Sequence, residues 1–143
     1  MPSALKTHRA DQPYRVLAVD DDPASTELTR IALESLSPSN SYVVRQVNNS
    51  QASVAVAQEF APDLIIMDVD MPRLDGRAAA LLIQCKEGLS DVPILFVTSM
   101  IPEHSGDNAF GWHGPLTKPV SPKVLVNTVE SILRDRFSHC TAS

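Results

Sequence analysis

Short apolar runs alternate with segments of helical spacing along most of the chain, and this alternation limits the possible folds more than any other feature. The expected strands are Tyr14–Val19, Tyr42–Val47, Leu64–Met67, Ile94–Val97 and a weak Pro115–Thr117. Several of them are apolar on both faces, which is typical of parallel strands that helices cover on both sides. The alternation therefore predicts an α/β fold with right-handed crossovers between parallel strands.

Helices are expected in the segments between and after these strands. They are Pro23–Leu36, Gln51–Phe60, Arg77–Glu87 and a last helix that begins at Ser121 and Pro122. The first has apolar residues at Leu28, Ile31, Ala32 and Leu36, and the last has Leu125, Val129, Ile132 and Leu133, which are helical spacings. We expect Asp22, Asp75 and Ser121 to act as N-caps, and Gly88 to follow the end of the third helix.

The domain boundaries follow from the same pattern. Residues 1–12 and 138–143 are expected to be flexible tails around one domain at 13–137. Between the fourth and fifth strands, Met100–Gly114 contains one proline and three glycines. Because these residues disfavour helix, we expect the fourth helix to be short or irregular.

Composition excludes several classes of protein. A chain of 143 residues with 43% hydrophobic residues can bury one core, and its net charge of −5 without a basic run argues against direct nucleic-acid binding. We expect no membrane span, because no apolar stretch is long enough, and no secretory signal at the start. Cys85 and Cys140 lack metal-ligand spacing, so we expect free thiols in a cytoplasmic protein, with Cys85 packed in the third helix.

Polar side chains follow the ends of four expected strands, at the edge where open α/β sheets bind ligands. They are Asp20, Asp21, Asp22, Asp68, Asp70, Thr98, Ser99 and Lys118. Several carboxylates at one edge repel one another unless a cation or protons relieve the repulsion, and Mg²⁺ suits such oxygen ligands. Since a hydroxyl and an ammonium at the same edge can hold a phosphoryl group, the set points to acyl-phosphate chemistry.

With these residues in place, the chain resembles the receiver domain (CheY-like) of two-component response regulators over residues 14–137. Four motifs carry the resemblance: VLAVDDDP (16–23), PDLIIMDVDMPRLDG (62–76), PILFVTS (93–99) and LTKP (116–119). It implies a flavodoxin-like, doubly wound (βα)5 fold with a five-stranded parallel sheet in the order 2-1-3-4-5. It also implies a stand-alone, single-domain response regulator, without room for an output domain.

The resemblance implies a role for each site residue. Asp68 would be the phosphoacceptor, and Mg²⁺ would be held by Asp20, Asp21, Asp68 and the backbone carbonyl of Asp70. The phosphoryl oxygens would be bound by Thr98 and Lys118, with Ser99 as the small residue that leaves access to the acceptor. The Lys118–Pro119 bond matches a position where the family often has a cis peptide.

Two departures from the family pattern affect the region that most receivers use for output. Pro115 occupies a position that is commonly aromatic, and the segment from Thr98 to Lys118 is shorter than usual and rich in glycine and proline. We therefore expect phosphorylation with an altered readout, involving Trp112 or Phe110. The Asp70 side chain is expected to affect the lifetime of the phosphate, in a direction that the sequence does not indicate.

The implied partners are a histidine kinase or histidine phosphotransfer protein and an unspecified downstream protein, with a homodimer as one further assembly. The chain would not be an enzyme beyond its own phosphorylation and dephosphorylation. Two alternatives stay open. One is a receiver-like interaction module that works without phosphorylation. The other is a haloacid-dehalogenase-type phosphatase, suggested by Asp68-Val69-Asp70, although its metal-binding acids would normally follow the lysine.

Overall fold

The computed structural model describes residues 12–37, 40–72, 74–99 and 111–141, the last four of these by their backbone. In chain order the elements are β1 (Tyr14–Val19), α1 (Pro23–Leu36), β2 (Tyr42–Val47), α2 (Ser50–Phe60), β3 (Leu64–Asp68), α3 (Gly76–Gln84), β4 (Ile94–Thr98), β5 (Trp112–Thr117) and α4 (Pro122–Thr141). No helix in this described part is both long enough and apolar enough to cross a membrane.

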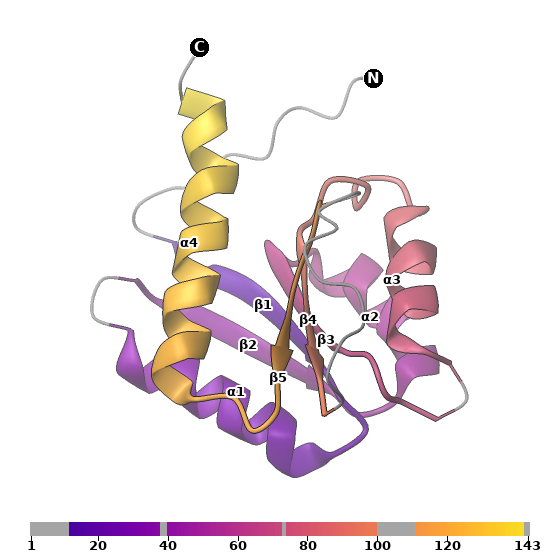
Figure 1. Cartoon of the computed structure of the whole chain (residues 1–143). Coiled ribbons are helices and arrows are strands. Elements are labelled where there is room, and N and C mark those ends of the chain that lie inside the picture. Colours follow the sequence, from indigo (N-terminus) through magenta and orange to yellow (C-terminus); the bar gives the residue numbers. More distant parts are fainter. Residues whose placement is uncertain (1–11, 38–39, 73, 100–110, 142–143) are drawn as a thin grey trace.

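The strands form a single five-stranded parallel sheet in the order β2-β1-β3-β4-β5, with helices on both faces (Figure 1). This confirms the expected flavodoxin-like fold and its strand order. Alternate residues of β1 explain the two layers: Leu17 and Val19 belong to one buried cluster with α2 and α3, whereas Val16 and Ala18 belong to another with α1 and α4. Both faces of the central strands are therefore apolar because both are covered.

The expected helix caps are confirmed. Asp22 and Asp75 accept hydrogen bonds from the backbone N–H groups of Ala24 (3.1 Å) and Arg77 (2.7 Å), at the starts of α1 and α3. Ser121 Oγ accepts from the N–H of Val124 at 3.5 Å at the start of α4. These caps begin α1, α3 and α4 close to the edge of the sheet where the acidic residues lie.

Three helices differ from the sequence patterns in packing or in length. In α1 only Ala32 of the four patterned apolar residues is buried, because the helix packs through Thr26, Ala32 and Leu33 instead. Helix α3 ends at Gln84, and Cys85 is its exposed C-cap, so the prediction that Cys85 packs in the helix is wrong. Helix α4 continues to Thr141, beyond the tail boundary expected at residue 137, while its four patterned residues are buried as predicted.

The fifth strand is longer than the sequence pattern indicates, and it contains a bulge. Leu95 pairs with His113 and Val97 pairs with Leu116, so a step of two residues on β4 faces a step of three on β5. Gly114 and Pro115 lie inside this irregular step. Because β5 is an edge strand, a bulge there accommodates a proline that has no N–H to donate. The fourth-helix prediction falls mainly on residues 100–110, outside the described residues, and residues 112–114 of that segment belong to β5.

The backbone conformation of this bulge requires glycine at position 114, so we expect a substitution there to lower the stability of the fold. The φ of Gly114 is +87°, and a Cβ there would lie 2.8 Å from the backbone oxygen of Phe96. Gly88 has a similar φ of +84°, but a Cβ at that position would have no heavy atom within 4 Å, so it is a matched control for the backbone conformation alone. We expect Gly88→Ala to lower the free energy of unfolding by ~1 kcal/mol and Gly114→Ala by ~3 kcal/mol. Urea unfolding measures both, and equal losses would contradict the steric contribution.

Candidate functional site

Four strands bring the predicted site residues to one edge of the sheet. Asp20 follows β1, Asp68 and Thr98 are the last residues of β3 and β4, and Lys118 follows β5. Because parallel strands point the same way, their carboxyl ends meet at this edge. Asp20, Asp68 and Thr98 are buried there, with 6%, 3% and 5% of their surface exposed.

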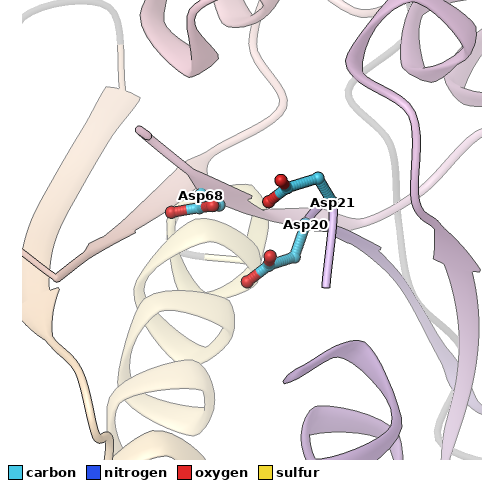
Figure 2. Close-up of side chains that lie close together, drawn as sticks. All are labelled: Asp20, Asp21 and Asp68. Atoms are coloured by element: carbon cyan, nitrogen blue, oxygen red, sulfur yellow. The ribbon is translucent and has the colours of Figure 1, made fainter. Parts of the chain in front are cut away.

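Three carboxylates gather at this edge. One oxygen from each of Asp20, Asp21 and Asp68 lies within 4.8 Å of the other two, and Figure 2 shows the three side chains close together at the ends of β1 and β3. Two oxygens on opposite sides of an octahedral Mg²⁺ lie about 4 Å apart. The residues present therefore fit a divalent cation of this kind if the three oxygens move slightly closer together.

Lys118 supplies the positive charge next to these acids. Its Nζ lies 2.6 Å from Asp20 Oδ2 and 3.6 Å from Asp68 Oδ1. The backbone N–H of Lys118 donates to the carbonyl of Thr98 at 2.8 Å, which holds the residue beside β4. The following bond to Pro119 is cis, as the sequence resemblance indicated. One ammonium therefore serves two buried carboxylates, and it lies nearer to Asp20.

The surroundings of Asp68 disfavour its charged form. Burial raises the pKa of the Asp68 carboxyl to about 6, and the negative charge of Asp20 acts in the same direction, while Lys118 and the N–H of Asp70 oppose it. For Lys118 the ion pairs outweigh burial, so the pKa of its ammonium is raised and the group stays charged at neutral pH. The site thus holds excess negative charge that a cation would relieve.

The Asp70 side chain has a contact that the sequence did not reveal. Thr98 Oγ1 donates a hydrogen bond to Asp70 Oδ2 at 2.6 Å, and the N–H and Oγ of Ser99 approach the same oxygen at 3.3 and 3.4 Å. These bonds, that of Thr98 above all, hold the pKa of the Asp70 carboxyl below its usual range. The sequence predicted the Asp70 carbonyl as a Mg²⁺ ligand and an effect of the Asp70 side chain on the lifetime of the phosphate, but not this contact with Thr98.

Two other supporting residues were missed as parts of the site. Asn48 Nδ2 donates to the carbonyl of Asp20 at 2.8 Å, so the connection after β2 holds the acidic loop in place. A Cβ on Gly76 would lie 2.0 Å from the carbonyl oxygen of Asp68. Glycine is therefore required for α3 to begin against the end of β3, and the Asp75-Gly76 pair was the available signal for this close approach.

A cavity of about 420 Å³ adjoins the charged residues. Asp20, Asp68 and Lys118 contribute to its wall, together with mainly apolar side chains from α1 and from the connection between β5 and α4, Leu28 and Val120 among them. Space beside the Asp68 carboxylate allows a small group to approach this otherwise buried side chain.

Pro115 and Trp112, two of the residues connected with the expected change in readout, both lie in β5. Pro115 is half-buried within the bulge. Trp112 packs edge-on against Phe96, with ring centroids 4.9 Å apart, and its Nε1 donates to Gln84 Oε1 at 3.0 Å. Trp112 therefore anchors β5 to α3, whereas Phe110 lies outside the described residues.

Comparison with known proteins supports the interpretation of the fold and of the family resemblance. The model of the response regulator receiver domain family matches residues 16–130. Protein PilH of Pseudomonas aeruginosa is 30% identical over 123 residues, which are 83% of this chain and 97% of PilH. The transcriptional regulator RpaA of Synechocystis sp. is 31% identical over 122 residues, which are 84% of this chain and 49% of RpaA; the chain thus spans about half of that relative. The crystal structure of chemotaxis protein CheY4 of Vibrio cholerae superposes with a TM-score of 0.74 at 26% identity, covering 85% of this chain and 99% of CheY4.

The charge excess at the site predicts that neutralising Asp68 stabilises the fold. We expect Asp68→Asn to raise the free energy of unfolding by about 1–2 kcal/mol at neutral pH without divalent cations, because a raised pKa marks a destabilised carboxylate. Asp91 is an exposed acid, so Asp91→Asn controls for loss of one negative charge and should change stability by less than about 0.5 kcal/mol. Chemical unfolding in a chelating buffer measures both, and a less stable Asp68→Asn protein would contradict the repulsion.

Proposed function

The chain belongs to the response regulator receiver family, and from this and the site geometry we propose that it accepts a phosphoryl group on Asp68 with the aid of Mg²⁺. The modified chain then signals through contact with another protein. The observation that carries the proposal is the position of the Asp68 carboxylate, which is buried beside Asp20, Asp21 and Lys118 and borders a cavity.

The arrangement suits nucleophilic attack by a carboxylate. An oxygen of Asp68 forms a bond to phosphorus as the bond from phosphorus to a histidine nitrogen, or to the oxygen of a small acyl phosphate, breaks. The Lys118 ammonium, 3.6 Å from Asp68 Oδ1, can neutralise charge on the transferred oxygens. The Thr98 hydroxyl, at the end of the neighbouring strand, can donate to one of them.

The residues that would hold Mg²⁺ are Asp20, Asp21, Asp68 and the backbone carbonyl of Asp70. A bound Mg²⁺ supplies positive charge next to the transferred phosphoryl oxygens. Asp20 is fixed for this purpose by two contacts, since its Oδ1 accepts from the N–H of Asp22 at 2.9 Å and its carbonyl accepts from Asn48. Asp21 is exposed, so it can adjust to close the cluster.

The proposed donor is a histidine kinase or a histidine phosphotransfer protein, and the proposed downstream partner is also a protein. Support comes from α1, where Leu28 lines the cavity with 65% of its surface exposed and Ile31 is 43% exposed. Exposed apolar side chains on α1, of which Leu28 shares the cavity wall with Asp68, provide a contact surface for a protein donor. Ser99, exposed and small, leaves the acceptor accessible from the end of β4.

A receiver-like module that works without phosphorylation is the second candidate, and Pro115 favours it. Proline in the bulge of β5 cannot make the ring movement of the aromatic residue commonly found at that position. The phosphatase alternative loses support, since it needs acids after the lysine, and Glu130 Oε2 instead accepts hydrogen bonds from Ser37 and Asn40.

Phosphorylation tests the proposal directly. In the presence of Mg²⁺ and acetyl phosphate, we expect one covalent phosphate per chain, stable to acid and released by hydroxylamine because it is an acyl phosphate. Intact-protein mass spectrometry measures it, and Asp68→Asn should abolish it. If the wild-type chain gains no phosphate from acetyl phosphate or from a panel of histidine kinases, the module without phosphorylation is the correct function.

Binding of Mg²⁺ provides a second test, with two adjacent acids as a matched pair. Asp22→Asn removes one charge but leaves a good N-cap and does not touch the three-carboxylate cluster, whereas Asp21→Asn removes a proposed ligand. We expect millimolar Mg²⁺ to raise the melting temperature of the wild-type and Asp22→Asn proteins. In Asp21→Asn the concentration needed should rise at least about tenfold, a loss of roughly 1.4 kcal/mol in binding. Equal Mg²⁺ dependence in both variants would contradict the proposed ligand set.

A further inference from the structure

One oxygen of Asp70 joins the loop after β3 to the end of β4. Asp70 Oδ2 lies 2.6 Å from Thr98 Oγ1, 3.3 Å from the N–H nitrogen of Ser99 and 3.4 Å from Ser99 Oγ. At its other end, the backbone N–H of Asp70 donates to Asp68 Oδ1 at 3.3 Å. Asp70 is thus in contact with both the proposed acceptor and the hydroxyl that would bind the transferred group.

The Thr98 hydroxyl cannot serve two acceptors at once. A hydroxyl has a single proton to donate. In the structure this proton goes to the Asp70 carboxylate, and hydrogen bonds to an ionised acceptor are stronger and shorter than neutral ones, in agreement with the 2.6 Å separation. A phosphoryl group on Asp68 would therefore have to take the hydroxyl proton away from Asp70.

We propose that Asp70 is a positioning residue that retains the Thr98 hydroxyl in the unphosphorylated protein and so opposes phosphoryl binding at Asp68. This inference rests on the proposed function. It also gives a direction to the effect of the Asp70 side chain, because loss of the carboxylate removes a competing acceptor of the hydroxyl proton and strengthens the interaction with a phosphoryl group.

The neighbouring groups single out Asp70 for this role. The Lys118 ammonium forms ion pairs with Asp20, at 2.6 Å, and Asp68, at 3.6 Å. It makes no direct ion pair with the described Asp70 side chain. The Asp70 side chain is exposed, so its removal leaves no unfilled space in the core. Its backbone carbonyl, the proposed Mg²⁺ ligand, is unchanged by any side-chain substitution. The competition can therefore be tested without altering the proposed ligand set.

The probe is beryllium fluoride, which mimics a phosphoryl group on a carboxylate, titrated into the full chain with saturating Mg²⁺ and followed by ¹⁹F NMR. We expect Asp70→Ala to bind about three- to tenfold more tightly than the wild-type chain, the range that loss of one charged hydrogen bond partly exposed to solvent would produce. Asp75→Asn is the matched control. It removes one charge from the same loop, keeps the cap of α3 and leaves the Thr98 contact intact, so binding should stay within about twofold of wild type.

A double-mutant cycle separates the hydrogen bond from simple charge repulsion. If Asp70 acts through Thr98, the gain from Asp70→Ala disappears in a Thr98→Val background, which lacks the hydroxyl, and persists in a Thr98→Ser background, which keeps it. An equal gain in the Thr98→Val background overturns the inference, because repulsion alone then explains the effect.

A second comparison leaves the buried Thr98 unchanged, in case Thr98→Val does not fold. Asp70→Asn removes the charge but keeps an oxygen that accepts from Thr98, so the inference expects a gain at least about twofold smaller than that of Asp70→Ala. Equal gains overturn it. If the wild-type chain binds beryllium fluoride and Asp70→Ala binds it no more tightly, the inference about Asp70 is wrong but the proposed function stands. If the wild-type chain binds no beryllium fluoride, the proposed function and the inference both fail.

Discussion

Two buried carboxylates share one ammonium at the carboxyl edge of the sheet, and much of the surrounding structure holds them there. Asp20 and Asp68 are each less than a tenth exposed, and the Lys118 ammonium is 2.6 Å from the first and 3.6 Å from the second. Like charges in a desolvated place destabilise each other, which is visible in the raised pKa of Asp68. The two carboxylates stay close together only because the rest of the fold holds them in place.

The fold imposes it through the sheet and a few close contacts. The β1–β3 and β3–β4 pairings align the ends of three strands, and the Lys118–Thr98 backbone bond brings the end of β5 to the same edge. Asn48 ties the acidic loop to the neighbouring connection, and Gly76 lets α3 start against the carbonyl of Asp68. The apolar layers on both faces provide the stability that offsets the repulsion among the acids.

The same edge contains the groups of the proposed phosphoryl transfer and the Asp70 side chain that we propose opposes it. Asp68 lies between a group that would favour phosphoryl binding, Lys118, and a loop whose Asp70 carboxylate holds the Thr98 hydroxyl. Neighbouring side chains thus influence the acceptor in opposite directions. In β5, Trp112 is fixed by Phe96 and Gln84, and Pro115, which stands where the family commonly has an aromatic residue, lies in a bulge.

The sequence by itself determined the strand order, the helix caps and the meeting of the acids, Thr98 and Lys118 at one edge. The caps and the shared edge follow from local periodicity and from the geometry of parallel strands, whereas the strand order was implied by the motifs that resemble the receiver family. Tertiary structure decided the buried face of α1, the exposure of Cys85 at the end of α3 and the bulge of β5. It also decided that the Asp70 side chain accepts the Thr98 hydroxyl, since the two residues are 28 positions apart. Contacts of this kind depend on how separate elements pack, and no local pattern contains that information.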